Sequence, residues 1–495
     1  MGTRVVGELG ESALEGQYLM TTFPDTTTQK QRDLNNSALA GPASLWRDTA
    51  HLPATEPVPL PGSGSTDVVI VGGGYTGLWT AYYLIKADPS LRITILERNL
   101  VGFGASGRNG GWASAIFPSS MRKMASLSDR DGAIRMQRAM NDTVVEIGRI
   151  SELEGIDCGF HQGGYVSVAR NEAQWARTQA EVQAWREWGF GDEQIVLLNA
   201  AQAGDRVAIT RTLGGTFNPN CAVIQPLDLV RGLAKVVRSL GVAIHETTTV
   251  TAIEPHLVRT DRGDLRADVI MRGTEGFTPS IAGAQRDIVP MYSLMIGTTP
   301  LSEAQWESIG LNDRETFSDK RHLRIYGQRT QDGRIAFGGR GAPYHYGSQV
   351  RPEYDLDARV HSMLRDIIAD MFPFLRDVEY THEWGGNLGI PRDWVPSVNF
   401  DRATGIAIAG GYVGDGVATS NIAGRTLRDA ILNVRDSELL RLPWAGRLSR
   451  KWEPEPARWL GVNAVTQLMM NADRQESKSG KPSKSAAAFW KSIGH

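Results

Sequence analysis

Residues 67–77 of this chain have the sequence DVVIVGGGYTG, in which an apolar run leads into glycines at positions 72, 74 and 77. The apolar run predicts a buried parallel strand, and the apolar spacing from Leu78 to Ile85 predicts a helix directly after the turn. Only glycine lets the backbone turn this sharply and lie this close to a phosphate group. The free N–H groups at the start of such a helix can hold a pyrophosphate.

A second strand and an acidic residue strengthen this interpretation. Residues 93–96, Ile-Thr-Ile-Leu, predict a strand that ends at Glu97, about 20 residues after the last glycine, where a carboxylate binds the ribose hydroxyls in dinucleotide-binding folds. The alternatives are a glycine-rich turn of structural use and a surface charge at Glu97. The order of strand, glycines, helix, strand and acid favours dinucleotide binding, and the negative charge argues against a 2′-phosphate.

The totals limit the class of protein. The length of 495 residues predicts two domains. A net charge of −2 gives no indication of nucleic acid or an anionic membrane as a partner. No apolar run reaches the length of a membrane span, and the N-terminus has no signal core. Cys158 and Cys221 have no metal-ligand spacing and are interpreted as buried side chains. We therefore expect a cytoplasmic protein with no metal.

A second glycine-rich run, residues 102–112, reads GFGASGRNGGW. Five glycines with Ser, Arg and Asn do not suit a packed element. The run is better interpreted as a loop that lies along a large cofactor and donates N–H groups to phosphate and ring. A solvated loop is the alternative.

The strands and helices suggest that the nucleotide-binding domain is assembled from separated segments. A third apolar strand, 406–409, meets the glycines of 410–416 and opens a helix, as the first strand does. We expect an α/β Rossmann-like domain beside a separate second domain that also contains strands. The predicted segments are a flexible extension (1–40), the nucleotide-binding domain (41–157, 225–285 and 386–440), the substrate domain (158–224 and 286–385) and a helical tail (441–495).

Several stretches together resemble the D-amino-acid-oxidase family of FAD-dependent oxidoreductases, and most of all its amine-oxidising branch typified by gamma-glutamylputrescine oxidase. They are spread over about residues 44–435, and they are residues 69–78, 102–111, 224–226, 337–340, 384–386 and 411–417. The resemblance implies that the mixed sheet of the second domain covers the isoalloxazine. It also implies oxidation of a C–N bond by hydride transfer to flavin N5, with O2 usually reoxidising the flavin to give hydrogen peroxide.

The glycine patterns and the resemblance together predict the FAD contacts. These are Gly72, Gly74, Tyr75, Thr76, Gly77, Glu97, Arg98, Gly104, Ala105, Ser106, Arg108, Asn109, Gly110, Gly111, Val250, Gly273, Thr274, Gly386, Gly414, Asp415, Gly416 and Val417. The N–H groups of residues 414–416 would face negative charge near flavin N1, unless Asp415 simply caps the helix. Non-covalent FAD is expected, because residues 104–115 and 385–388 contain no Cys or His.

The chain departs from the family at residues 272–276, Arg-Gly-Thr-Glu-Gly, where Ala-Thr-Gly or Ala-Thr-Asn is more usual. Glu275 would place a carboxylate near the flavin or the pocket. The usual contact at this point is therefore in doubt.

No acid/base pair stands out, and a neutral amine can react without one if the pocket orients and desolvates it. Arg324, with Arg340 second, could bind a substrate carboxylate; an Arg held by a strand salt bridge is the alternative. An aromatic cage for a cationic amine could come from Tyr292, Tyr326, Trp384 and Tyr412, although each alone is more often core. His322, His345 and His382 receive no role.

The predicted function is an FAD-dependent oxidase of a primary or secondary amine, either an amino acid or an acylated polyamine, with O2 as acceptor. Two alternatives stay open. One is a dehydrogenase that passes electrons to a quinone or a protein carrier, and the other is a flavin-binding protein without a redox role. The oligomeric state is left open.

Overall fold

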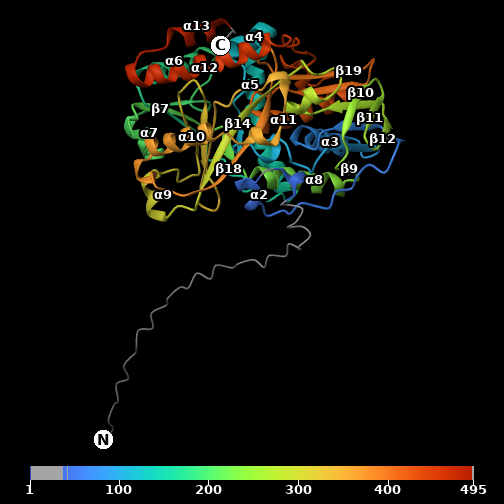
Figure 1. Ribbon diagram of the computed structural model, residues 1–495, viewed down its shortest axis with the longest axis horizontal. Helices are drawn as coiled ribbons and strands as arrows, with labels where there is room; N and C mark the ends of the chain where they lie inside the picture. The colour runs from blue at the N-terminus through green and yellow to red at the C-terminus, as the bar shows by residue number, and fades with distance from the viewer. Residues whose placement is uncertain (2–36, 42, 493–495) are drawn as a thin grey trace.

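The structure is a computed structural model that describes residue 1 and residues 37–41 and 43–492. Most of the expected N-terminal extension therefore lies outside the described residues. The elements of one sheet gather on one side of the molecule and those of a second sheet on the other (Figure 1), with the C-terminal helices along one edge.

A six-stranded sheet forms one half of the molecule. Its strand order is β19-β20-β13-β2-β3-β9, in which only β19 is antiparallel to its neighbour. The strands are β2 (Val68–Val71), β3 (Ile93–Leu96), β9 (Ala243–His245), β13 (Val269–Arg272), β19 (Ser397–Asp401) and β20 (Ile406–Gly410). The expected α/β fold built from discontinuous segments is confirmed.

The two faces of this sheet are covered differently, and the alternation of side chains along β2 explains how. Val68 and Ile70 pack in the core formed with the helices, whereas Val69 and Val71 pack in a separate core with strands of a small sheet. The helices of the first face are α3 (Tyr75–Ala87), α5 (Arg130–Leu153), α8 (Pro226–Ser239) and α11 (Gly416–Ile431). The small sheet contains β1 (Gly64–Ser65), β10 (Val250–Glu254), β11 (Leu257–Thr260) and β12 (Gly263–Arg266).

The second half contains an eight-stranded mixed sheet of order β18-β14-β17-β16-β15-β5-β7-β6. Its strands are β5 (Tyr165–Ala169), β6 (Val196–Asn199), β7 (Gly214–Asn218), β14 (Val289–Thr298), β15 (Thr316–Asp319), β16 (Ile325–Arg329), β17 (Ile335–Arg340) and β18 (Tyr380–Ile390). Strands β16 and β17 form an antiparallel pair, and residues 331–333 lie in the turn between them. The predicted division of the chain stays a prediction, and its boundary at 385/386 falls inside β18.

The remaining elements connect or cover the two sheets. They are the pair β4 (Trp112–Ser114) and β8 (Cys221–Val223), and the helices α2 (Leu45–Asp48), α4 (Met121–Leu127), α6 (Glu172–Glu187), α7 (Ala200–Arg206), α9 (Glu303–Ile309), α10 (Ala358–Met371), α12 (Ala457–Ser479) and α13 (Lys484–Ser492). Across the described part of the chain, no helix combines the length and the apolar character that a membrane span requires.

Candidate active site

A cavity of about 1090 Å³ lies where the two sheets meet. Its walls include the carboxyl ends of β2 and β3, the segment after β20, and residues of β14, β16 and β17. Open α/β sheets bind ligands at the carboxyl ends of their strands. The volume exceeds the ~300–1,000 Å³ that is usual for a single drug-sized ligand, so there is space for a dinucleotide beside a substrate.

Most of the predicted FAD contacts line this cavity. They are Gly72, Gly74, Tyr75, Thr76, Glu97, Arg98, Gly104, Ala105, Ser106, Arg108, Asn109, Gly110, Val250, Gly273, Thr274, Gly386, Gly414, Asp415, Gly416 and Val417. Gly77 and Gly111 do not line it, and both serve close packing instead. A Cβ on Gly77 would meet the Gly72 carbonyl oxygen at 2.1 Å, and one on Gly111 would meet Gln328 Nε2 at 2.0 Å.

The start of α3 has the geometry that a pyrophosphate requires. Gly72 has φ +111°, and a Cβ there would lie 2.8 Å from the Gly273 carbonyl oxygen. Gly74 caps α3 without a side chain, so the helix presents backbone N–H groups. One of them, the Tyr75 N–H, donates to Ser106 Oγ at 2.9 Å, which joins the two glycine-rich runs.

Glu97 holds the loop between these elements. Its Oε2 accepts from the Gly73 N–H at 2.8 Å and its Oε1 from the Asn99 N–H at 2.9 Å. Burial raises the pKa of the Glu97 carboxyl, and the backbone N–H groups and Arg98 oppose that rise only in part. Glu97 therefore faces the cavity rather than the protein surface.

Three buried N–H donors of the cavity-lining residues have no hydrogen-bond partner within the described chain. They are Arg108 Nη2, Trp112 Nε1 and Asn387 Nδ2. None of these three nitrogen atoms is accessible from the cavity, so they belong to the packed wall behind it and do not by themselves indicate a ligand. The cavity wall instead offers backbone N–H groups at the starts of α3 and α11, which no side chain caps. Phosphate and carbonyl oxygens of FAD are acceptors for such groups, and the residues present therefore fit FAD.

Arg108 has a structural partner that sequence reasoning missed. Its Nη1 donates to Asp355 Oδ2 at 2.7 Å, and its guanidinium lies 4.5 Å from the centre of the Phe103 ring. Burial raises the pKa of Asp355 to about 6, although Arg108 opposes the rise. Asp355 precedes α10 and is far away in sequence, so no local pattern could have identified the pair.

The other end of the cavity carries a cluster of charge. Arg324 lies immediately before β16 rather than on a strand, and its carbonyl oxygen accepts from the Arg340 N–H at 3.1 Å, so the two arginines are neighbours across β16 and β17. Asp415 lies near both guanidinium groups; burial raises the pKa of its carboxyl, and the two arginines lower it. The Asp415 side chain makes no cap to α11, which corrects the capping alternative.

The predicted aromatic cage does not form. Tyr326 and Tyr412 line the cavity, but Tyr292 and Trp384 do not. Tyr292 points to the opposite face of β14 from Ser293, which lines the cavity, because successive side chains of a strand alternate. Trp384 is fully buried and donates its indole N–H to the Arg108 carbonyl oxygen at 3.0 Å.

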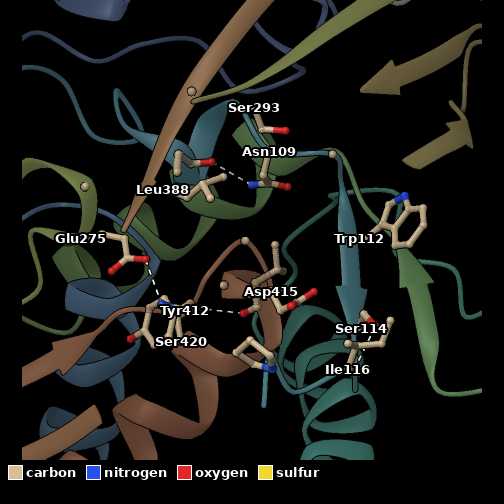
Figure 2. Close-up of a pocket in the computed structure, with 18 of the residues that line it drawn as sticks. Asn109, Trp112, Ser114, Ile116, Glu275, Ser293, Leu388, Tyr412, Asp415 and Ser420 are labelled. Carbon is tan, nitrogen blue, oxygen red and sulfur yellow. Dashed lines mark hydrogen bonds between the residues drawn. The ribbon is translucent and has the colours of Figure 1, made fainter. Parts of the chain in front are cut away.

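A different set of aromatic side chains, centred on Trp112, lines the cavity instead of the predicted cage. The Trp112 ring lies 5.1 Å from Tyr165 and 6.1 Å from Tyr326, measured between ring centres, and all three residues line the cavity. Figure 2 shows Trp112 across the cavity from Asp415, Tyr412 and Glu275. The signal for Trp112 was available, because it ends the second glycine-rich run.

Glu275, the residue that departs from the family pattern, connects three separated segments. Its carboxylate accepts from the N–H groups of Gly411 at 2.7 Å, Tyr412 at 3.1 Å and Gly389 at 3.3 Å. Figure 2 shows the bond from Tyr412. Burial raises the pKa of Glu275 to about 7 in spite of these three donors. Glu275 therefore fixes the chain between β20 and α11, where that chain forms the cavity wall.

The comparisons with known proteins agree with this geometry. The family described as DAO, FAD dependent oxidoreductase, matches residues 67–430. Gamma-glutamylputrescine oxidoreductase of Escherichia coli (strain K12) is 30% identical over 379 residues, which cover 74% of this chain and 83% of that protein. A probable oxidoreductase, OrdL, of Haemophilus influenzae is 28% identical over 78% of this chain and 86% of its own.

Solved structures share the fold. Glycine oxidase from Geobacillus kaustophilus superposes with a TM-score of 0.65 at 19% identity, over 77% of this chain and 98% of that one. L-proline dehydrogenase from P. horikoshii gives 0.62 at 18% identity, over 78% and 98%. From the extent of the family match and the cavity at the strand ends, which both glycine-rich runs line, we conclude that the chain belongs to the DAO family of FAD-dependent oxidoreductases, with FAD as its cofactor.

Proposed function

We propose that this protein oxidises the C–N bond of a primary or secondary amine of the amino-acid or acylated-polyamine type. In this proposal O2 is the final electron acceptor and hydrogen peroxide a product. Bound FAD supplies the two-electron oxidant. The name of the E. coli relative, gamma-glutamylputrescine oxidoreductase, supports an amine that carries an amino-acid group.

The observation that carries the proposal is the charge at the substrate end of the cavity. Arg324 and Arg340 provide two guanidinium groups there against the single carboxylate of Asp415. Asp415 balances one of the two positive charges, which leaves the other for an anionic group of a ligand. A substrate carboxylate supplies that anion, and a guanidinium binds it with two parallel hydrogen bonds. The substrate is then oriented with its amine toward the interior.

The other walls of the cavity position the substrate and exclude water from it. Tyr326 donates to or accepts from Ser293 Oγ at 2.7 Å, which fixes its ring beside Trp112. The N–H groups at the start of α11 face the cavity and are placed to stabilise negative charge on the bound flavin. Tyr412 O–H and Thr76 Oγ1, 3.1 Å apart, join that region to α3.

FAD is held without a covalent bond in this proposal. Neither Cys158 nor Cys221 is among the described residues that line the cavity. Burial raises the pKa of Cys158 to about 11 and that of Cys221 to about 12. Thiols in this state are poor nucleophiles. The one histidine in the wall, His322, has both ring nitrogens in hydrogen bonds to protein atoms.

The experiment is an anaerobic titration of the purified flavoprotein with a panel of amines, followed through the flavin absorbance band. Bleaching by amines that carry a carboxylate, more readily than by their decarboxylated analogues, is the expected result. Admission of air then restores the band and releases hydrogen peroxide. Reoxidation by a quinone but not by air would make the protein a dehydrogenase, and a flavin that no amine bleaches would contradict the proposal.

A further inference from the structure

Helices α12 and α13 close one side of the cavity. They lie beside α6 at the edge of the molecule (Figure 1). Their segment contributes Glu476, Pro482, Ser483, Ala487 and Trp490 to the lining. The family match ends at residue 430, so this wall lies outside the matched region.

The wall is attached to the segment that precedes β16. Glu476 accepts from Arg177 Nη2 at 2.8 Å and bonds to His322 Nε2 at 2.9 Å. Asp473 accepts from the backbone N–H groups of His322 at 2.7 Å and Leu323 at 2.9 Å. Burial alone would raise the pKa of Glu476, but His322 and Arg177 lower it to about 2.

This cluster is an anchor rather than a metal centre. One ligand atom of each of His322, Asp473 and Glu476 lies within 4.8 Å of the others, a spacing that a metal ion could use. However, the carboxylates already accept hydrogen bonds from Arg177 and from backbone N–H groups. The positively charged guanidinium of Arg177 therefore occupies the position that a metal ion would need.

Trp490 extends the anchor into the cavity wall. Its indole N–H donates to His322 Nδ1 at 3.3 Å, so Nδ1 is an acceptor and the ring proton lies on Nε2, toward Glu476. His322 stands two residues before Arg324, so Trp490 and the arginine pair belong to the same side of the cavity.

The charges near Trp490 are paired with one another. Lys320 pairs with Glu181, and Arg321 pairs with Asp319 at 2.6 Å, both within the lining. This part of the wall therefore presents an aromatic ring among neutralised charges. Such a surface suits an uncharged alkyl or acyl chain and not a second ionic group.

We propose that Trp490 is a specificity-determining residue, which contacts the chain of an extended amine whose carboxylate is bound at Arg324 and Arg340. The proposal rests on the amine-oxidising function proposed above. It assigns to α13 the selection of long substrates over compact amino acids. The reacting end of the cavity does not depend on Trp490.

The test compares Trp490→Ala with wild type, and with Lys491→Ala, which changes the exposed neighbour on the same helix. Each protein is reduced anaerobically with a series of amines that differ only in chain length. Loss of an apolar contact in a pocket changes discrimination by about 10-fold or more. We expect Trp490→Ala to lose the preference for long amines through a higher dissociation constant, with the limiting rate of flavin reduction and the reduction by the shortest amine nearly unchanged. Lys491→Ala should behave as wild type.

A second measurement needs no substrate. Acrylamide quenching of the flavin fluorescence reports access to the cavity, and Trp490→Ala should increase the quenching constant relative to Lys491→Ala. If Trp490→Ala retains FAD, wild-type length selectivity and wild-type quenching, the proposal is overturned. If Trp490→Ala increases the quenching but no amine reduces even the wild-type flavin, Trp490 does restrict access to the cavity, and it is the proposed amine oxidation that fails.

Discussion

The replacement Glu275→Gln tests the most unusual electrostatic feature of the cavity. It keeps the shape of the side chain but removes the ionisable group that accepts three backbone N–H bonds. The side chain is half-buried by surface area because it borders the cavity, while the surrounding protein shields it from bulk water. Burial raises its pKa from the ordinary value of 4.5 to about 7.

A raised carboxyl pKa has a definite consequence for stability. Between pH 4.5 and 7 the folded protein binds the Glu275 proton more tightly than the unfolded chain does. The stabilisation from this group is therefore complete below pH 4.5 and is lost as the pH rises through about 7. At 1.36 kcal/mol for each pH unit, the loss amounts to about 3 kcal/mol.

The Gln variant lacks this dependence. Its free energy of unfolding relative to wild type should therefore rise by about 2.5 kcal/mol between pH 5 and pH 8, whatever constant cost the amide imposes. The assay is urea unfolding followed by tryptophan fluorescence, at several pH values, constant ionic strength and excess FAD. Glu307→Gln, which removes an exposed carboxylate from α9, is the control. Parallel pH dependence of Glu275→Gln and wild type would refute the reasoning.

Three further replacements address the rest of the cavity. Gly77→Ala places a methyl group 2.1 Å from the Gly72 carbonyl oxygen. Overpacking against backbone costs about 1–3 kcal/mol, so the purified variant should show a much lower ratio of flavin to protein absorbance. Retained flavin would count against the assigned packing. Arg108→Met leaves Asp355 without its 2.7 Å partner and should lower stability by about 3–5 kcal/mol in thermal unfolding, whereas the double variant with Asp355→Asn should recover most of the loss. Arg324→Met should raise KM for carboxylated amines about 10-fold or more, because a charged hydrogen bond is lost, and should leave amines without a carboxylate nearly unchanged in steady-state assays.

The backbone features of the FAD site could be predicted from the sequence because their causes are local. The glycines at 72 and 74, the helix that starts at Tyr75 and the carboxylate after the second strand all depend on a few consecutive residues. A strand that meets glycine and opens a helix has few alternative conformations. The same reasoning found the segment 410–417, although it lies more than 300 residues away in the chain.

The direction of single side chains was harder to predict. Tyr292 was expected in the substrate pocket, but strand β14 turns it to the face opposite Ser293. A shift of one residue in strand register exchanges the two faces, and no pattern within residues 289–298 determines that register. Trp384 was similarly expected at the pocket, and packing against Trp46 and Arg108 keeps it in the core.

The sequence by itself determined that this protein has a dinucleotide-binding fold with discontinuous segments, because glycine positions and apolar periodicity act over a few residues. Only the tertiary structure decided which distant groups meet: Asp355 with Arg108, Glu275 with Gly411, and Trp490 with His322. These contacts join residues that are 136 to 247 positions apart. Side chains so far apart are brought together by sheet register and by the packing of whole elements, which short-range patterns in a sequence do not record.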